Sequence, residues 1–181
     1  MKVVYDHSHL GGKQILSSDF PSMKREILEI IASIKDPGKT KLSKEKTKTG
    51  KMLYAPALLN KLFDKAFRER GWDKKRDYFN IELPGYDVKI NGAFKETDYV
   101  KGPIGAEVQF GKYAFMLYDL LKFQYLYMNG FIKVGIEIVP CKRLQRDMST
   151  GVSFGEQLVS DLIRMQAVFP SCSIWVILVD F

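Results

Sequence analysis

The sequence lacks the signatures of several common protein classes. Its two cysteines, Cys141 and Cys172, lie far apart without a Cys-x-x-Cys motif, so neither a disulfide framework nor a cysteine zinc site is expected. The only two histidines, His7 and His9, make a histidine-rich zinc centre unexpected, and a His-x-His pair is more often a surface or turn feature. There is no P-loop, no Gly-x-Gly-x-x-Gly fingerprint and no serine–histidine–aspartate motif in a supporting context.

Long apolar runs are also missing. No run approaches the roughly 20 residues that cross a bilayer, and charges interrupt the N-terminal stretch where a signal peptide would be apolar. Together with the unpaired cysteines, this favours a reduced, cytoplasmic protein. With 46% hydrophobic residues and neither repeats nor a clear boundary, residues 1–181 are expected to form one domain with a single core.

What the sequence does have is an excess of positive charge. The formal net charge is +7, and the stretch KDPGKTKLSKEKTKTGK, Lys35 to Lys51, holds seven lysines against Asp36 and Glu45. A solvated, mobile loop would explain this composition. Serine, threonine and glycine between lysines would equally suit a loop that follows a phosphate backbone. The charge therefore favours a polyanionic partner without identifying it.

The spacing of apolar residues predicts an α/β fold. We expect strands at 2–5, 79–83, 86–90, 104–110, 131–140 and 173–181, and helices at 23–34, from Pro56 to before Gly71, at 113–128 and at 156–169. Pro84 and Gly85 separate the second and third strands, which favours a β-hairpin there. The strand–helix alternation in the second half of the chain predicts a partly parallel sheet flanked by helices.

Polar residues interrupt the apolar strand at 104–110. Glu107 and Gln109 share one face of this strand, and burying such groups without partners costs about 1–3 kcal/mol each. A lysine paired with Glu107 would be a purely structural explanation, and a cleft that holds a metal ion would be a functional one. Asp98 can return alongside Glu107 through a turn at 101–103. Two carboxylates form a hard, incompletely filled site, which suits Mg²⁺.

An acidic pair, a strand, basic surroundings and a following helix are the arrangement of the PD-(D/E)xK nucleases. The sequence resembles the BstYI/BglII family of type II restriction endonucleases over nearly its whole length, in the segments VVYDHSHLGG, KREILEIIASI, KLSKEKTKTGKMLYAPALLNKLF, ERGWDKKR, TDYVKGPIGAEVQFGKYAFMLYDL, VGIEIVP and MSTGVSF. Residues 78–96 form a shorter segment than the family leads us to expect. The resemblance implies a PD-(D/E)xK restriction-endonuclease-like fold, with a central mixed sheet flanked by helices.

The resemblance also implies catalytic roles. The family has an aspartate followed by Glu-x-Gln, with glutamine where most of the superfamily has lysine, and this motif maps onto Asp98, Glu107 and Gln109. Asp98, Glu107 and the carbonyl of Val108 would hold Mg²⁺, while Gln109 would orient the attacking water. Mn²⁺ would substitute for Mg²⁺, and Ca²⁺ would support binding without cleavage.

The resemblance further implies how DNA would be met. Base edges would be read from Lys112, Ser149 and Thr150, although a phosphate contact is an alternative for Lys112. The DNA backbone would be contacted by Lys44, Lys46 and Lys48. A homodimer would cut double-stranded DNA at a palindrome with a GATC core, such as RGATCY or AGATCT, leaving 5′ overhangs and 5′-phosphates, and a DNA methyltransferase would belong to the same system.

Three other functions remain open from the sequence. The chain could be a repair or nicking nuclease of the same fold, or a sequence-specific DNA-binding protein with an inactive site. It could also be an α/β domain with a basic surface and no nuclease function.

Overall fold

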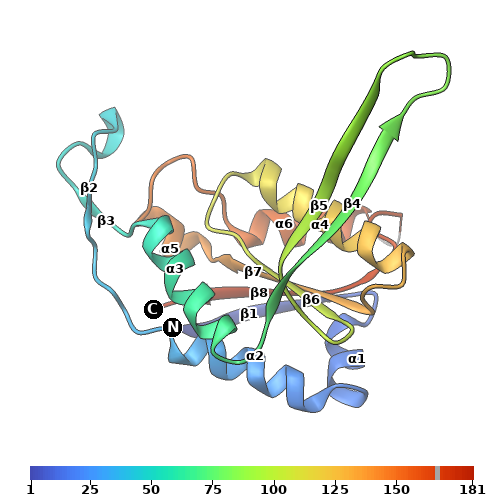
Figure 1. Ribbon diagram of the computed structural model, residues 1–181. Helices are drawn as coiled ribbons and strands as arrows, with labels where there is room; N and C mark the ends of the chain where they lie inside the picture. Colours follow the sequence, from blue (N-terminus) through green and yellow to red (C-terminus); the bar gives the residue numbers. More distant parts are fainter. Residues whose placement is uncertain (166–167) are drawn as a thin grey trace.

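The strands at the centre of the sheet come from the most apolar stretches of the sequence. In the computed structural model, which describes residues 1–165 and 168–181, six strands form one mixed sheet (Figure 1). In spatial order these strands are β1 (Lys2–His9), β8 (Ser173–Asp180), β7 (Val134–Pro140), β6 (Ile104–Val108), β5 (Lys89–Lys101) and β4 (Asp73–Glu82). The strands β8, β7 and β6 are parallel, and the other neighbours are antiparallel. The predicted mixed sheet flanked by helices is confirmed.

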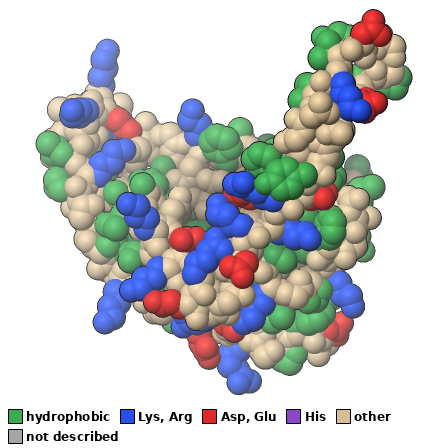
Figure 2. All heavy atoms as spheres, in the orientation of Figure 1, with side chains coloured by type: hydrophobic (Ala, Val, Ile, Leu, Met, Phe, Trp, Pro, Cys, Tyr) green, Lys and Arg blue, Asp and Glu red, His purple; other side chains and the backbone are tan. Residues whose placement is uncertain are grey.

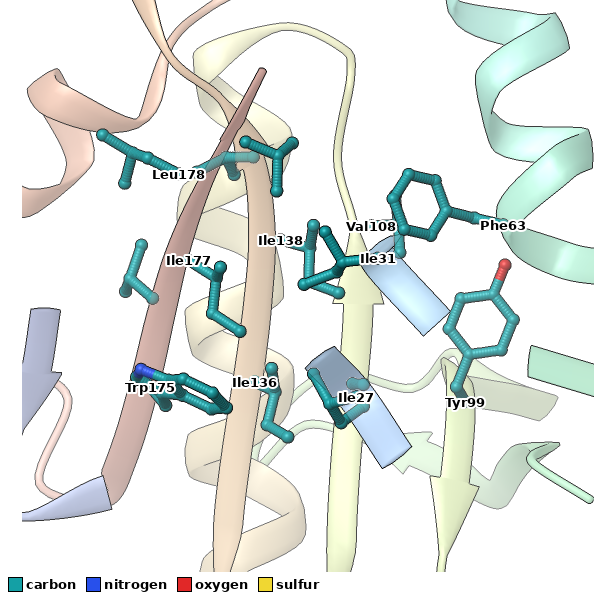
Figure 3. Packing of buried hydrophobic residues seen from close by; sticks show 14 of the residues in the cluster. Ile27, Ile31, Phe63, Tyr99, Val108, Ile136, Ile138, Trp175, Ile177 and Leu178 are labelled. Carbon is teal, nitrogen blue, oxygen red and sulfur yellow. The ribbon is translucent and has the colours of Figure 1, made fainter. Parts of the chain in front are cut away.

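Helices cover both faces of the sheet. They are α1 (Gly12–Ser18), α2 (Pro21–Ser33), α3 (Pro56–Arg68), α4 (Tyr113–Met128), α5 (Lys142–Arg146) and α6 (Gly155–Met165). Both α2 and α3 begin with proline, which fits the first turn of a helix because its missing N–H has no helical partner there. Figure 3 shows Ile27 of α2 and Phe63 of α3 packed on the face that carries Val108 and Ile138. The opposite face, which carries Glu107, is covered by α4.

Several predicted bounds need correction. The strand predicted at 2–5 continues to His9, because β1 is an edge strand whose polar residues pair with β8, and buried His9 contacts the Pro170 carbonyl. The strand predicted at 131–140 begins at Val134 and is buried on both faces rather than alternating. The helix predicted to end at 169 is described as far as Met165; residues 166–167 lie outside the described residues, and 168–169 form a bend, so the helix does not reach 169.

Two segments project upward from the body in Figure 1. One is the predicted hairpin, whose strands β4 and β5 are much longer than expected and turn at Gly85. The other is the lysine-rich stretch, which is not simply an open loop: β2 (Lys41–Leu42) pairs with β3 (Met52–Leu53), and a 3-10 turn at Lys46–Lys48 lies between them. Figure 2 shows Lys and Arg side chains on this lobe and hydrophobic side chains along the hairpin.

In the described part of the chain, no helix is long and apolar enough to span a membrane.

Candidate active site

The β5–β6 hairpin brings the two predicted carboxylates together. The chain turns at Gly102, and Tyr99 pairs with Ala106, so that Asp98 and Glu107 lie opposite one another. The Asp98 backbone N–H donates to Glu107 Oε1 at 3.3 Å. Glu107 is 3% exposed, whereas the Asp98 side chain is 42% exposed and lies 3.6 Å from the Lys74 ammonium. One carboxylate is therefore fixed in the interior and the other lies at its rim.

Gln109 lies just beyond the end of β6, with its amide held in one orientation. Its side-chain Nε2 donates to Asp119 Oδ2 at 2.9 Å, and a carboxylate partner selects the NH₂ end of the amide. The oxygen Oε1 lies against Gly111, where a Cβ would come within 2.4 Å of it. The amide oxygen is therefore the end left to accept a further hydrogen bond.

Sequence reasoning missed two site residues on α4. The Lys122 ammonium contacts Glu107 Oε1 and lies 2.8 Å from Asp119 Oδ1. The structural alternative considered for Glu107, a lysine partner, is thus present. Asp119 and Lys122 are the only charged residues in the sequence of α4, and their spacing of three places them on one face of the helix. This charged pair in an otherwise apolar helix is the sequence feature that could have indicated their place in the site.

Sequence reasoning also missed a buried carboxyl on the next strand. Glu137 of β7 is in register with Glu107 of β6 and is fully buried. Within residues 1–165 and 168–181, its two carboxyl oxygens are the only buried side-chain nitrogen or oxygen atoms without a hydrogen-bond partner. The sequence feature that could have indicated Glu137 is a Gly-x-Glu pattern that β6 and β7 share. In the structure Gly105 and Gly135 are also in register.

Burial raises the pKa values of the carboxyl groups in this cluster. Burial raises the pKa of Glu107 and of Asp119, and the Lys122 ammonium opposes both shifts. Burial alone would lower the pKa of Lys122, but Glu107 and Asp119 outweigh it and raise that pKa. Burial raises the pKa of Glu137, and the neighbouring acids Asp119 and Glu107 add to the rise. The cluster thus combines three buried carboxyl groups, those of Glu107, Asp119 and Glu137, with the ammonium of Lys122.

The donor set fits Mg²⁺ in part. Among the described residues, no group of three His, Cys, Asp or Glu side chains is arranged to hold a metal ion. Asp98 and Glu107 nevertheless supply two hard oxygen donors, and Val108, whose carbonyl is the third predicted ligand, follows Glu107 directly. Mg²⁺ commonly binds one or two carboxylates and completes its shell with water and phosphate oxygens, so the residues present suit it.

The segments predicted to read DNA bases lie close together. Ser153 N–H donates to the Gly111 carbonyl at 2.8 Å, which joins the loop after α5 to the residue before Lys112. Lys112 is exposed and immediately precedes α4. Thr150 is exposed and Ser149 half-buried in the joined loop.

The lysine-rich lobe packs against the same loop. Glu45 accepts hydrogen bonds from the Thr150 N–H at 3.2 and 3.0 Å, and Lys41 donates to Ser149 Oγ at 2.6 Å. Lys44 and Lys46 are exposed. The third lysine predicted to contact the DNA backbone differs from the other two. Lys48 donates to the carbonyl of Arg146, the last residue of α5, at 2.9 Å, and to that of Met148 in the loop that follows.

Comparison with known proteins identifies the class. The fold is that of a restriction endonuclease: the crystal structure of restriction endonuclease BglII complexed with a DNA 16-mer has a TM-score of 0.76 at 21% identity, covering 100% of this chain and 78% of that one. Free BglII has a TM-score of 0.67 at 18% identity, covering 100% and 80%. A comparison with curated protein sequences gives no match.

A family model described as restriction endonuclease BglII/BglIII matches residues 5–179. The chain therefore belongs to the BglII/BglIII family of restriction endonucleases, which are type II site-specific deoxyribonucleases.

Proposed function

We propose that this chain hydrolyses phosphodiester bonds of double-stranded DNA at a short palindrome with a GATC core, in a Mg²⁺-dependent reaction. The products would carry 5′ overhangs and 5′-phosphates. The observation that carries the proposal is the β5–β6 register, which sets Asp98 opposite Glu107 in a chain of this family. The solved neighbour BglII is complexed with DNA, which supports a duplex as the substrate.

Each site residue has a separate task. Asp98, Glu107 and the Val108 carbonyl would hold Mg²⁺. When bound, the ion would polarise the scissile phosphate, lower the pKa of a water and stabilise the leaving 3′ oxygen. Gln109 cannot act as a general base because its amide is uncharged. With its nitrogen held by Asp119, its oxygen accepts a hydrogen bond from the attacking water and orients it.

The exposed residues beside the site would bind DNA. Lys112 would donate to guanine O6 or N7 in the major groove, and Ser149 and Thr150 would donate or accept at neighbouring base edges. Lys44 and Lys46 would follow the phosphates, which fixes register rather than sequence. Lys48 would contribute indirectly, because it holds the loop that carries Ser149.

A second copy of the chain would complete the enzyme. Phe115, Tyr118, Leu121 and Met128 of α4 are 53%, 41%, 43% and 75% exposed, an unusual amount of apolar surface on one helix. A palindrome has two-fold symmetry, so a symmetric homodimer would place one site on each strand. Helix α4 would then present Lys122 to the site and its apolar residues to the partner.

Other requirements follow from this activity. Mn²⁺ would replace Mg²⁺ in cleavage, while Ca²⁺ would support binding without cleavage. A methyltransferase of the same system would protect the host's sites without a stable complex with this chain, and the pair would act in the cytoplasm.

Digestion of unmethylated phage DNA, with Mg²⁺ or with EDTA, tests the proposal. We expect discrete fragments with Mg²⁺ only, and sequencing of the fragment ends should find GATC in the overhangs. Discrete fragments without GATC would refute the recognition site, and sequence-independent degradation would indicate a repair-type nuclease.

One observation favours a second candidate, a sequence-specific DNA-binding protein without activity. Glu107 already has a cationic partner in Lys122, which satisfies this carboxylate without a metal ion. Tight, specific binding in Mg²⁺ with no strand scission would support this candidate over the nuclease.

A further inference from the structure

We infer that the ammonium group of Lys122 occupies one of two positions, here called seats. It pairs with Glu107 in the ion-free protein and shifts to Glu137 when a divalent ion binds Glu107. The inference rests on the proposed function, since it takes Glu107 as a metal ligand. Lys122 would then be a positioning residue of the site, and Glu137 the carboxylate that allows metal and lysine to be present together.

The first seat is the one that Lys122 occupies in the structure. Its ammonium lies between Glu107 Oε1 and Asp119 Oδ1, at 2.8 Å from the latter. The Asp98 N–H donates to the same Glu107 oxygen. A divalent ion on Glu107 would lie beside the ammonium in a poorly solvated interior, where like charges repel strongly. The ion and Lys122 therefore compete for Glu107.

The second seat is Glu137. Its oxygens have no hydrogen-bond partner within residues 1–165 and 168–181, and its side chain is fully buried. A buried carboxyl without a partner destabilises a fold, so a purely structural role does not explain this glutamate. Because Glu137 is in register with Glu107, the backbones that carry these two carboxyl groups lie about 4.8 Å apart, the spacing of adjacent strands.

The position of α4 makes the shift possible. A Cβ built on Gly135 would meet Phe123 at 2.6 Å, and one built on Gly105 would meet the same ring at 3.6 Å. The helix therefore straddles β6 and β7 at the residue next to Lys122. The four-carbon stem of lysine is flexible, and it can carry the ammonium from one strand to the other without movement of the helix.

Calcium affinity of the DNA-free protein, measured by titration calorimetry, tests the inference without cleavage. Lys122→Gln removes the competitor and should tighten Ca²⁺ binding by about tenfold, while Glu137→Gln removes the second seat and should weaken it by about tenfold. Lys101→Gln is the control, because it breaks the ion pair with Glu26 (2.8 Å) outside the site, and it should leave Ca²⁺ affinity unchanged.

Thermal unfolding provides a second readout. Glu137→Leu should fold, because it replaces a buried carboxyl without a hydrogen-bond partner among the described residues, and the β7 residues on the same face, Gly135 and Val139, are apolar. It should raise the unfolding temperature of the ion-free protein while weakening Ca²⁺ binding, whether or not Lys122→Gln folds. An essential structural role for Glu137 predicts a lower unfolding temperature instead, and that result would overturn the inference.

Asp98→Ala separates this inference from the proposed function. If wild type binds no Ca²⁺, the proposed metal site fails and the inference fails with it. If wild type binds Ca²⁺ and Asp98→Ala abolishes that binding, the metal site stands. The inference alone is then wrong if Lys122→Gln and Glu137→Gln shift the affinity in the same direction or leave it unchanged.

Discussion

At the scale of single residues, the role proposed for Gln109 depends on the orientation of its side-chain amide. Asp119 holds the nitrogen of Gln109, and Gly111 leaves room for its oxygen. An uncharged side chain can orient a water only if it is itself held, because a freely rotating amide would present donor and acceptor alike.

Gly111→Ala tests this arrangement. The new Cβ would come 2.4 Å from Gln109 Oε1, and the atom that must yield is the far end of a flexible side chain. We expect cleavage to slow by about 10–100-fold, as for a misplaced catalytic group, with little change in the unfolding temperature. In a Gln109→Ala background the same substitution should cost nothing further; additive losses of rate would contradict the account.

The residues predictable from sequence are those fixed by local geometry. Strand alternation and a glycine turn are local properties, and they place Asp98 beside Glu107. The roles of Lys122 and Glu137 depend on how α4 lies across β6 and β7, and on the register of two parallel strands. Neither the position of α4 nor the register of the strands can be read from neighbouring residues in the sequence. Asp119 and Lys122, the only charged residues of an otherwise apolar helix, were the one local indication of the site.

At the scale of elements, the lysine-rich lobe is a built structure with two kinds of lysine. Lys48 is engaged by backbone carbonyls, whereas Lys44 and Lys46 are exposed. Composition alone does not distinguish this built structure from an open loop. The hydrogen bonds that hold the lobe run to residues near the loop after α5, about a hundred residues away in the sequence. Glu45 accepts one of these hydrogen bonds from the Thr150 N–H.

Replacing Lys44 and Lys46 together with alanine should weaken binding to every DNA sequence and reduce the slope of log affinity against log salt by about two, since each phosphate contact contributes about 0.9. Filter binding or fluorescence anisotropy in Ca²⁺ at several salt concentrations measures this slope. Lys48→Ala is the matched comparison and should lower specificity more than salt dependence. Loss of affinity for one sequence only, in the double variant, would mean that these lysines read bases.

At the scale of the whole molecule, α4 connects the site to the expected partner. Its sequence predicts a mostly buried helix, but Leu121 and three neighbouring apolar residues are exposed. A single chain's sequence does not distinguish apolar residues that face its own core from those that face a second copy. The exposed apolar surface of α4 is thus one part of the described fold, besides the β4–β5 hairpin, that has no partner within a single chain.

Leu121→Glu should convert a dimer into a monomer, because a buried charge without a partner destabilises an interface. Sedimentation velocity should show the lower mass, and double-strand cleavage should fall at least tenfold at protein concentrations where wild type is dimeric. Leu28→Glu, at an exposed position of α2 on the other face of the sheet, is the control. A Leu121→Glu protein that stays dimeric would show that the interface lies elsewhere.

The measurement that tests the central claim most directly compares Glu107→Gln with wild type, in cleavage with Mg²⁺ and in specific DNA binding with Ca²⁺. The substitution keeps the shape of the side chain and an acceptor for Lys122. The account predicts cleavage reduced by about a thousandfold or more, as expected when a metal ligand is lost, with specific binding retained. Equal loss of cleavage and binding, together with a lower unfolding temperature, would contradict it and would mean that Glu107 supports the fold through Lys122.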